Sequence, residues 1–576
     1  MASFLANFVE GMRQCTKCRQ FILAGITKIS GQIAGKTSAA KPYFSINGRV
    51  QLPLIDRIRY RPKHPKRLTP LYVMKRILLT IAFVLGNANF VQAQTSFTDA
   101  TAIGVWNTTR WNNSTDGPSY TSTYTVANAV SFTAGTYSIA GMGASINVGN
   151  VTVTNGVTVS FTANANTFAT GGNIRTLDVG ASGLLDFSSQ AISTAAGTGF
   201  IKNGAGVLAL NGSSYAGGFT LNSGTVVVRG VNAMGSGGSL TINGGVIAAN
   251  GNRDLTGKYG GGITVGGDFI LGASTGLASA SANLTFSNNI NLGAATRTIS
   301  IGGSGLYTLG GVISNTSGGL NVNGSGGGGM LLSGANTYTG GTTVSAGTLS
   351  AGNNTAFGSG VVSVSGGSLT LNSGITLNNA INVGASGRIN GNAASSTLSG
   401  TISGSGTLGG SLTVSGTLSP GNSPGIMTID GNLTLGSAAI YQWELANLST
   451  SGAGTNFDQI SLTSSGSLAI NSGATLAPVF GASLAPNEGN SFWNTNRSWA
   501  VVQNNGSGTI TGSFLINNSP WSNGTFSFNS SNSQVTLDWT AAAVPEPSTY
   551  AVLFGIATLV FVALRQRAHK VPPAAV

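Results

Sequence analysis

The sequence predicts an all-β fold: a β-solenoid with a C-terminal β cap, preceded by a signal peptide and followed by a transmembrane helix. Gly accounts for 87 of 576 residues and charged residues for 7%, against about 25% charged residues in an average globular protein. Two segments of the body repeat each other, and short alternating runs are separated by Gly, Asn and Ser. Together these observations favour stacked β coils over a compact globular core.

A secretory signal is expected at residues 74–93. Met74-Lys75-Arg76 is followed by an apolar run over residues 77–85 and then by small residues that end at Ala93. This is the order of charged, apolar and cleavage regions that a signal peptide requires. The apolar run is too short to span a bilayer core of about 30 Å. We therefore predict cleavage between Ala93 and Gln94.

Residues 1–73 form a basic extension upstream of this signal. Residues 1–76 contain 15 Lys or Arg and two acids, whereas residues 77–564 contain nine Lys or Arg and 12 acids. The net charge of +13 therefore belongs to the ends, and the body lacks the clustered cations of a nucleic-acid interface. We expect that Met74 is the true start, or that the extension is lost with the signal.

The C-terminal end has the layout of a membrane anchor. Pro545-Glu546-Pro547 precedes an apolar stretch that begins at Tyr550 and ends at Leu564, and basic residues follow it. The prolines interrupt the preceding structure, the stretch is just long enough for a short span, and the basic cluster favours the cytoplasmic side. An uncleaved membrane anchor is the alternative interpretation of these features.

Residues 544–570 also resemble the PEP-CTERM sorting signal of Gram-negative bacteria. The resemblance rests on the order of a Pro-Glu-Pro motif, an apolar helix and a basic tail. It implies that Pro545, Glu546 and Pro547 are recognised by an exosortase-type enzyme, after transient anchoring in the inner membrane, and that the tail is then removed.

The body repeats a supersecondary unit. The segment that starts Tyr215-Ala-Gly-Gly matches the segment that starts Tyr338-Thr-Gly-Gly, and the similarity continues at a constant offset of 123 residues. Alternating runs such as residues 240–242 and 368–371 are typical of strands. One sandwich core does not extend over some 350 residues, whereas a solenoid adds coils freely. The sequence thus predicts a solenoid region at 94–199 and a more regular one at 200–440.

The repeat at residues 326–352 resembles the autotransporter-associated β-strand repeat of passenger domains. Residues 416–425, Gly-Thr-Leu-Ser-Pro-Gly-Asn-Ser-Pro-Gly, are similar to the segment that closes such passengers. The resemblance is strong over about 200–460 and implies a right-handed parallel β-helix at the cell surface. Autotransporters end in a membrane β-barrel, whereas this chain ends in an apolar stretch, so we expect the sorting signal to replace self-translocation.

Aromatic residues gather between 441 and 543. A solenoid end must cover its open edge, so this region is predicted to be a C-terminal β cap with buried aromatic residues. Exposed Trp side chains that stack on sugars are the alternative. Trp106 and Trp111 are candidates for covering the N-terminal end of the solenoid. The aromatic residues concerned are Tyr441, Trp443, Phe457, Phe492, Trp493, Trp499, Trp521, Phe526, Phe528 and Trp539.

The residue types for most catalytic chemistry are missing from the body. Both cysteines, Cys15 and Cys18, and both histidines, His64 and His569, lie near the chain ends, which excludes a His-based triad or metal site in the body. Two carboxylates could still support glycoside chemistry. The candidates are Asp254 and Asp268 in the middle of the chain, and Asp430, Glu444 and Asp458 near the cap.

These observations favour a structural or adhesive protein without an active site, a cofactor or a metal. We expect it to be secreted or held at the surface of a Gram-negative bacterium, with signal peptidase and an exosortase-type enzyme as processing partners. An exopolysaccharide is a candidate ligand, and nucleic acid is not. A polysaccharide lyase or hydrolase on the same scaffold is the first alternative, and a non-catalytic glycan-binding protein is the second.

Overall fold

The computed structural model describes residues 94–97, 103–106, 111–113 and 129–568. Within the last range it leaves out 140–145, 148, 162–167, 170–172, 188–191, 194–197, 212–216, 274–275, 316, 422 and 544–546. Residues 1–89 and 90–576 form separate units, and the described residues belong to the second. The predicted extension and signal, Ala93 included, lie outside the described residues, and Gln94 begins the first strand.

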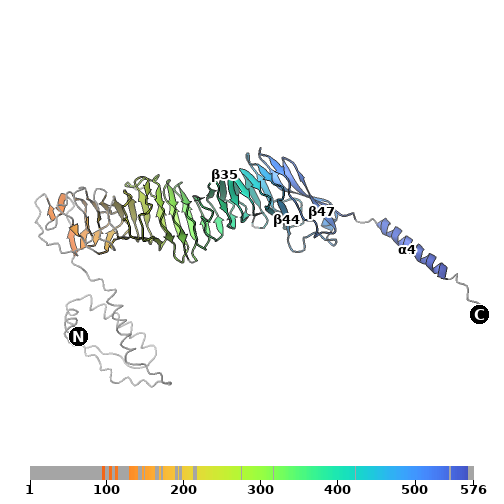
Figure 1. Cartoon of the computed structure of the whole chain (residues 1–576), viewed down its shortest axis with the longest axis horizontal. Helices are drawn as coiled ribbons and strands as arrows, with labels where there is room; N and C mark the ends of the chain where they lie inside the picture. The colour runs from red at the N-terminus through yellow and green to blue at the C-terminus, as the bar shows by residue number, and fades with distance from the viewer. Residues whose placement is uncertain are drawn as a thin grey trace, which may run out of the picture. The chain divides into compact units, whose positions relative to one another are not determined.

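The strands of the solenoid pair in parallel with the corresponding strands of the preceding coil and of the following coil (Figure 1). Sheet A contains β1 (Gln94–Phe97), β4 (Ala129–Phe132), β7 (Val151–Val153), β10 (Arg175–Val179), β13 (Phe200–Asn203), β15 (Phe219–Leu221), β17 (Leu240–Ile242), β20 (Ile263–Val265), β23 (Ile290–Asn291) and β26 (Ile313–Ser314). Sheet C contains β6 (Ile146–Asn147), β9 (Phe168–Ala169) and β12 (Ile192–Ser193).

Sheet B runs through the whole solenoid. Its parallel strands are β2 (Ile103–Trp106), β5 (Thr136–Ile139), β8 (Thr158–Phe161), β11 (Leu184–Phe187), β14 (Val207–Leu210), β16 (Thr225–Val228), β18 (Val246–Ala249), β21 (Phe269–Leu271), β24 (Arg297–Ile301), β27 (Leu320–Gly324), β29 (Thr342–Val344), β31 (Val362–Val364), β34 (Ile381–Val383), β36 (Thr401–Gly404), β38 (Thr417–Pro420), β41 (Ile440–Leu445) and β44 (Thr475–Phe480). At the N-terminal end, β3 (Trp111–Asn113) pairs antiparallel with β2 and places Trp111 opposite Trp106.

Sheet D begins in the middle of the chain and continues into the cap. Its strands are β19 (Arg253–Asp254), β22 (Leu284–Phe286), β25 (Leu306–Leu309), β28 (Gly329–Leu332), β30 (Thr348–Ala351), β32 (Ser368–Leu371), β33 (Thr376–Leu377), β35 (Arg388–Leu398), β37 (Thr407–Val414), β39 (Ile426–Ile429), β40 (Asn432–Leu435), β42 (Gln459–Leu462), β43 (Leu468–Ile470), β45 (Arg497–Asn504), β46 (Ile510–Gly512), β47 (Gly524–Ser530) and β48 (Gln534–Ala541). The predicted all-β solenoid is confirmed.

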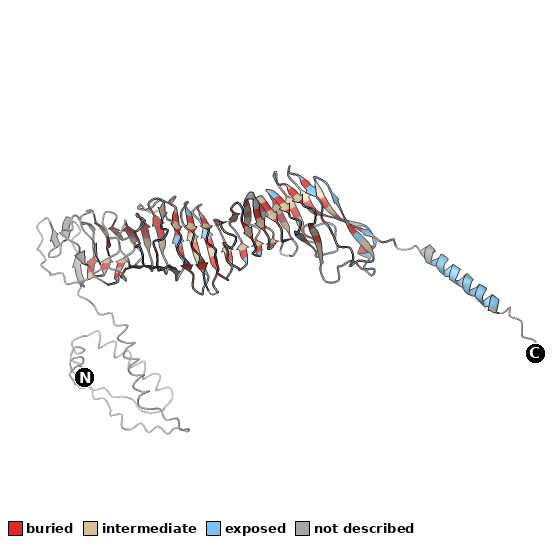
Figure 2. Ribbon diagram, in the orientation of Figure 1, coloured by how far each residue is buried: buried red, intermediate tan, exposed pale blue. Residues whose placement is uncertain are grey.

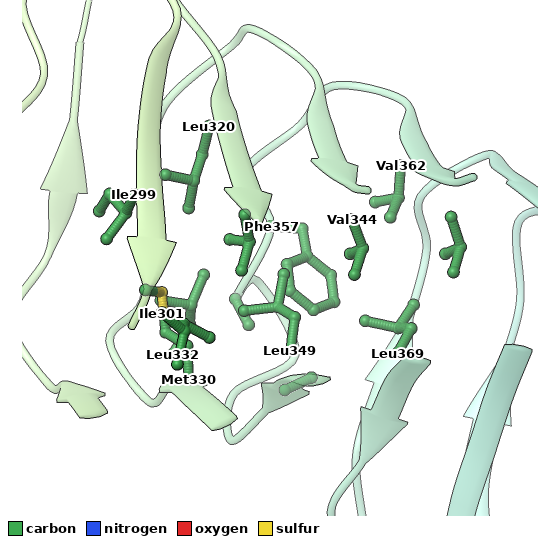
Figure 3. Close-up of a cluster of buried hydrophobic side chains, with 14 of the residues drawn as sticks. Ile299, Ile301, Leu320, Met330, Leu332, Val344, Leu349, Phe357, Val362 and Leu369 are labelled. Carbon is green, nitrogen blue, oxygen red and sulfur yellow. The ribbon is translucent and has the colours of Figure 1, made fainter. Parts of the chain in front are cut away.

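Alternation along each strand builds the core. In most strands every second residue is buried, while its neighbours are partly exposed (Figure 2). Parallel register then stacks like on like: Met330, Leu349 and Leu369 occupy the same position in consecutive coils of sheet D (Figure 3). Each such side chain contributes about 1.5–3 kcal/mol by leaving water. The apolar column is therefore continuous along the solenoid.

The two sequence repeats lie on different sheets. In the first, β14, β15 and β16 belong to sheets B, A and B; in the second, β28, β29 and β30 belong to sheets D, B and D. The repeat is therefore displaced by one face of the solenoid between its two occurrences. The sequence predicts a strand–corner–strand unit but does not determine which face of the solenoid the unit occupies.

Close approach of successive coils explains the paired glycines at the corners. A Cβ on Gly217 would lie 0.9 Å from the carbonyl oxygen of Thr198, and a Cβ on Gly340 would lie 2.2 Å from that of Gly318. Both contacts are to backbone, which cannot move aside without breaking the ladder. Glycine is needed at these positions because any other side chain would separate the coils.

Asparagine side chains join neighbouring coils at other corners. Asn222 donates to Asn203 and Asn243 donates to Asn222, each at 2.8 Å, which makes a short ladder on sheet A. Asn336 is buried and bridges three coils: its oxygen accepts from the Ile313 amide at 2.8 Å and its nitrogen donates to the Ala356 carbonyl at 2.6 Å. The Asn336 amide thus satisfies backbone groups of two other coils, whereas the Asn222 ladder joins side chains of neighbouring coils.

The C-terminal cap packs around a cluster of tryptophans. Strand β48 pairs antiparallel with β45 and β47, which ends the parallel stacking. Trp443, Trp493, Trp499 and Trp539 are buried, and their rings contact one another, as with Trp493 and Trp539 at 5.2 Å between ring centroids. The prediction of a C-terminal β cap is confirmed. A short 3-10 helix, η2 (Ser491–Asn494), carries Trp493 into the cluster.

Two edge strands of the cap are blocked against further pairing. Asn518 accepts from the Phe526 amide of β47 at 2.7 Å and donates to its carbonyl at 2.9 Å, so a side chain takes the place of another strand. Pro478 lies in β44, the last strand of sheet B, and has no amide hydrogen to offer. Both features are typical ways of protecting a sheet edge.

One α-helix occurs in the described part of the chain, α4 (Pro547–Ala568). At 1.5 Å per residue its 22 residues extend about 33 Å, enough for the hydrocarbon core of a bilayer. The span Tyr550–Arg567 is long and apolar enough to cross a membrane, and none of it is buried against protein. Arg565 and Arg567 lie in its last turn.

Candidate functional site

The predicted sorting signal, residues 544–570, contains α4, and its Pro-Glu-Pro motif ends where the helix begins. Pro547 is the first residue of the helix, where the missing amide hydrogen of proline costs nothing. Pro545 and Glu546 lie outside the described residues, as does His569. The apolar stretch that follows is exposed along its length, which suits a lipid environment better than water. The segment thus combines a short motif with an exposed apolar helix.

The two acids in the middle of the chain serve local backbone structure. Asp254 is exposed and accepts from the Thr256 amide at 2.9 Å and from its hydroxyl. These hydrogen bonds lower the pKa of Asp254. Asp268 accepts from the Thr298 amide of the next coil at 2.8 Å. Each carboxylate therefore acts as a turn or coil acceptor, and no hydrogen bond joins Asp254 to Asp268.

Asp430 forms an ion pair that crosses a whole coil. Arg388 on β35 donates to both oxygens of Asp430, one of them at 2.7 Å, and also to Asn390 at 2.6 Å. Gly409 lies between the Arg388 and Asp430 side chains. A Cβ at this position would be 2.0 Å from an Arg388 nitrogen and 2.6 Å from an Asp430 oxygen. The absence of a side chain at Gly409 leaves the space in which the pair forms.

Glu444 and Asp458 are the only two of the five predicted acids in direct hydrogen-bond contact within the described part of the chain. The buried Asp458 carboxylate accepts from the Gly425 amide at 2.7 Å and from the Glu444 amide at 3.0 Å. Glu444 accepts from the Ser423 hydroxyl at 2.8 Å. Burial raises the pKa of Asp458 to about 7, although the two amide donors oppose the shift. Both Asp458 oxygens are engaged with backbone, so the pair fastens residues 423–425 to β41.

Lys202 was missed by the sequence reasoning. It occupies an inward position of β13, in register with Leu177 and Leu221, and is fully buried. Its ammonium group donates to the carbonyls of Asn203 at 2.6 Å, Gly204 at 2.7 Å and Ser223 at 3.2 Å. Burial lowers the pKa of Lys202 to about 8. The signal in the sequence that could have identified Lys202 is a lysine at a position where the strand alternation places a buried apolar residue.

We expect Lys202→Met to lower the stability of the solenoid by about 2–3 kcal/mol, because three carbonyls lose their donor while the apolar stem is kept. Thermal unfolding followed by circular dichroism measures the loss. Lys258→Met, at a partly exposed position, is the matched control and should have little effect. Equal shifts in the two variants would contradict the assigned role.

Four of the cap tryptophans have no exposed ring on which a sugar could stack. Trp443, Trp493, Trp499 and Trp539 are at most 1% exposed, and their indole nitrogens donate to backbone carbonyls, as Trp499 does to Ser449 at 2.7 Å. Trp521 is partly buried against Phe480 and Phe526. Among the residues described, no cluster of three or more His, Cys, Asp or Glu could hold a metal ion.

Comparison with known families identifies two kinds of segment. Residues 200–228 and 325–351 match the Passenger-associated-transport-repeat family, and these are the segments whose strands lie on sheets B-A-B and D-B-D. Residues 543–568 match the PEP-CTERM protein-sorting motif, which covers the junction before α4 and the whole of the helix. No curated protein matches the chain.

Proposed function

We propose that this chain, which carries passenger-associated transport repeats on a β-solenoid and a PEP-CTERM sorting motif at its end, is a structural or adhesive component of a Gram-negative cell surface or extracellular matrix. The repeats and the motif are those of an exported protein. The motif implies recognition by exosortase-type sorting machinery. Cleavage after Ala93 and release from a transient inner-membrane anchor belong to this proposal.

One observation carries the proposal: an extended polar scaffold and a sorting signal occur on the same chain. The solenoid uses its acids and its buried lysine for structure, at Asp254, Asp268, Asp430, Asp458 and Lys202. Stacked coils give a long outer surface for little sequence, which suits a scaffold. A carboxylate-based polysaccharide enzyme receives no support from the Glu444–Asp458 contact, because the buried Asp458 carboxylate binds backbone amides.

Substitution of the motif tests the sorting step. In the full chain expressed in a host with exosortase-type machinery, Pro545→Ala/Pro547→Ala should leave most of the protein in the inner membrane, because the recognition motif is lost while α4 remains. Cell fractionation and mass spectrometry of the termini measure the outcome. The tail variant Pro572→Ala/Pro573→Ala is the control. Normal surface delivery of the motif variant would overturn the proposal.

A further inference from the structure

The outer face of sheet B carries a registered column of hydroxyl and amide side chains. From β27 to β38, parallel pairing places the six members of this column in consecutive coils: Asn321, Thr343, Ser363, Asn382, Ser403 and Ser419. All six side chains are partly exposed. We call this set the sheet B column. Its members are spaced by the distance between strands, about 4.8 Å.

Half of the side chains of this column are engaged within the protein and half are not. Asn321 donates to Thr298 at 3.4 Å and accepts from Ser345 at 3.3 Å, and Asn382 donates to Ser403 at 3.4 Å. The side chains of Thr343, Ser363 and Ser419 make no hydrogen bond to another described residue. The backbone groups of the strands pair within the sheet, so these side chains supply the groups that an external molecule can contact.

Charge excludes most classes of partner for this face. Residues 298–387 contain no Asp, Glu, Lys, Arg or His, and Arg388 is paired with Asp430 on sheet D. An acidic polymer or nucleic acid needs a cationic surface, and a basic partner needs acids. The molecule that fits the sheet B column is therefore neutral.

A second copy of the chain fits less well than a sugar polymer. Stable protein interfaces have an apolar centre and bury about 800 Å² on each side, whereas this column consists of polar residues one side chain wide. The large hydrophobic side chains exposed on the described part of the solenoid include no aromatic ring on which a sugar could stack. A neutral polysaccharide presents a continuous row of hydroxyl groups, and it would bind the column edge-on by hydrogen bonds.

We propose that the sheet B column binds a neutral polysaccharide that runs along the solenoid. The proposal rests on the proposed surface function and names its partner. Each contact is weak because it replaces a bond to water, so affinity depends on many coils acting together. Binding that contains no ion pairs is insensitive to salt.

The test uses the purified full chain in detergent, with cellulose, dextran and mannan as neutral probes and alginate as the acidic probe. We expect binding to at least one neutral probe, little binding to alginate, and no loss at high salt. Thr343→Ala/Ser363→Ala/Ser403→Ala should weaken neutral binding at least about tenfold, because three hydroxyls of the column are lost. The sheet D variant Ser350→Ala/Ser368→Ala/Thr370→Ala removes the same residue types and should bind normally.

Failure to bind any neutral probe, equal binding by both variants, or binding that disappears in salt would overturn the proposal. Light scattering tests the second copy: self-association that only the sheet B variant abolishes would assign the face to a dimer instead. Circular dichroism confirms that both variants fold. Labelling of the protein on intact cells is independent of glycan binding, so surface delivery without binding would refute the ligand and leave the proposed function standing.

Discussion

Gly340→Ala should destabilise the solenoid by about 3 kcal/mol or more, a large effect for a single methyl group. The new Cβ would lie 2.2 Å from the Gly318 carbonyl oxygen, 2.3 Å from its carbon and 2.5 Å from the Gly319 nitrogen. All three atoms belong to backbone of the previous coil, so relief requires the coils to separate. Because each coil contacts only its neighbours, the damage should remain local.

Hydrogen exchange of peptides around residue 340 and thermal unfolding measure this effect. Gly329→Ala is the control within the same repeat, because its Cβ would meet nothing closer than 3.6 Å. Gly217→Ala, at the equivalent position of the first repeat, should behave like Gly340→Ala, since its Cβ would lie 0.9 Å from a carbonyl oxygen. Wild-type exchange in Gly340→Ala would show that the corner spacing is not fixed by glycine.

The folded protein should be more stable at pH 5 than at pH 8, because burial of Asp458 disfavours its charged form. The pKa of Asp458 is raised to about 7 in the folded protein from an ordinary value of 3.8. The folded state therefore binds more protons than the unfolded state between these values. The stabilising contribution is complete below about pH 4 and is lost as the pH rises through 7. Between pH 5 and pH 8 the loss is on the order of 2 kcal/mol.

Denaturant-induced unfolding at pH 5 and at pH 8 measures this change in stability. Asp458→Asn cannot titrate and should remove the pH response. It should also lower stability at every pH by about 1–3 kcal/mol, since its amide group would face one of the two backbone donors. Glu444→Gln is the control, and the pH response should persist in it. An unchanged pH response in Asp458→Asn would refute the assignment.

The sequence was sufficient to predict the class of fold because its signals are local and repeated. Alternation in runs such as Leu240–Ile242 and Ser368–Leu371 matches strands with buried Leu and Ile, as predicted. The aromatic region was recognisable as a cap because its tryptophans gather in one stretch of the sequence, and they extend the buried core of the solenoid. The position of the apolar helix followed from composition and from the prolines before it.

The contacts between coils could not be predicted, because the coil length varies. Neighbouring strands of sheet B pair Val207 with Thr225 but Ile440 with Thr475, so no fixed period predicts which residues meet. The Arg388–Asp430 pair over Gly409 and the grip of Asp458 on Gly425 depend on that register. Lys202 is a different case, since the alternation of β13 already places it inward, but the sequence does not show which carbonyl groups it meets.

The blocked edges of the cap bear on how large an assembly this chain can build. With Asn518 filling the hydrogen-bonding positions of Phe526 on β47 and Pro478 interrupting those of β44, addition of another molecule as the next coil is disfavoured there. We therefore expect this end to resist growth into an open-ended fibre. The length of the solenoid would then be set by the number of coils that the gene encodes, and not by the concentration of the protein.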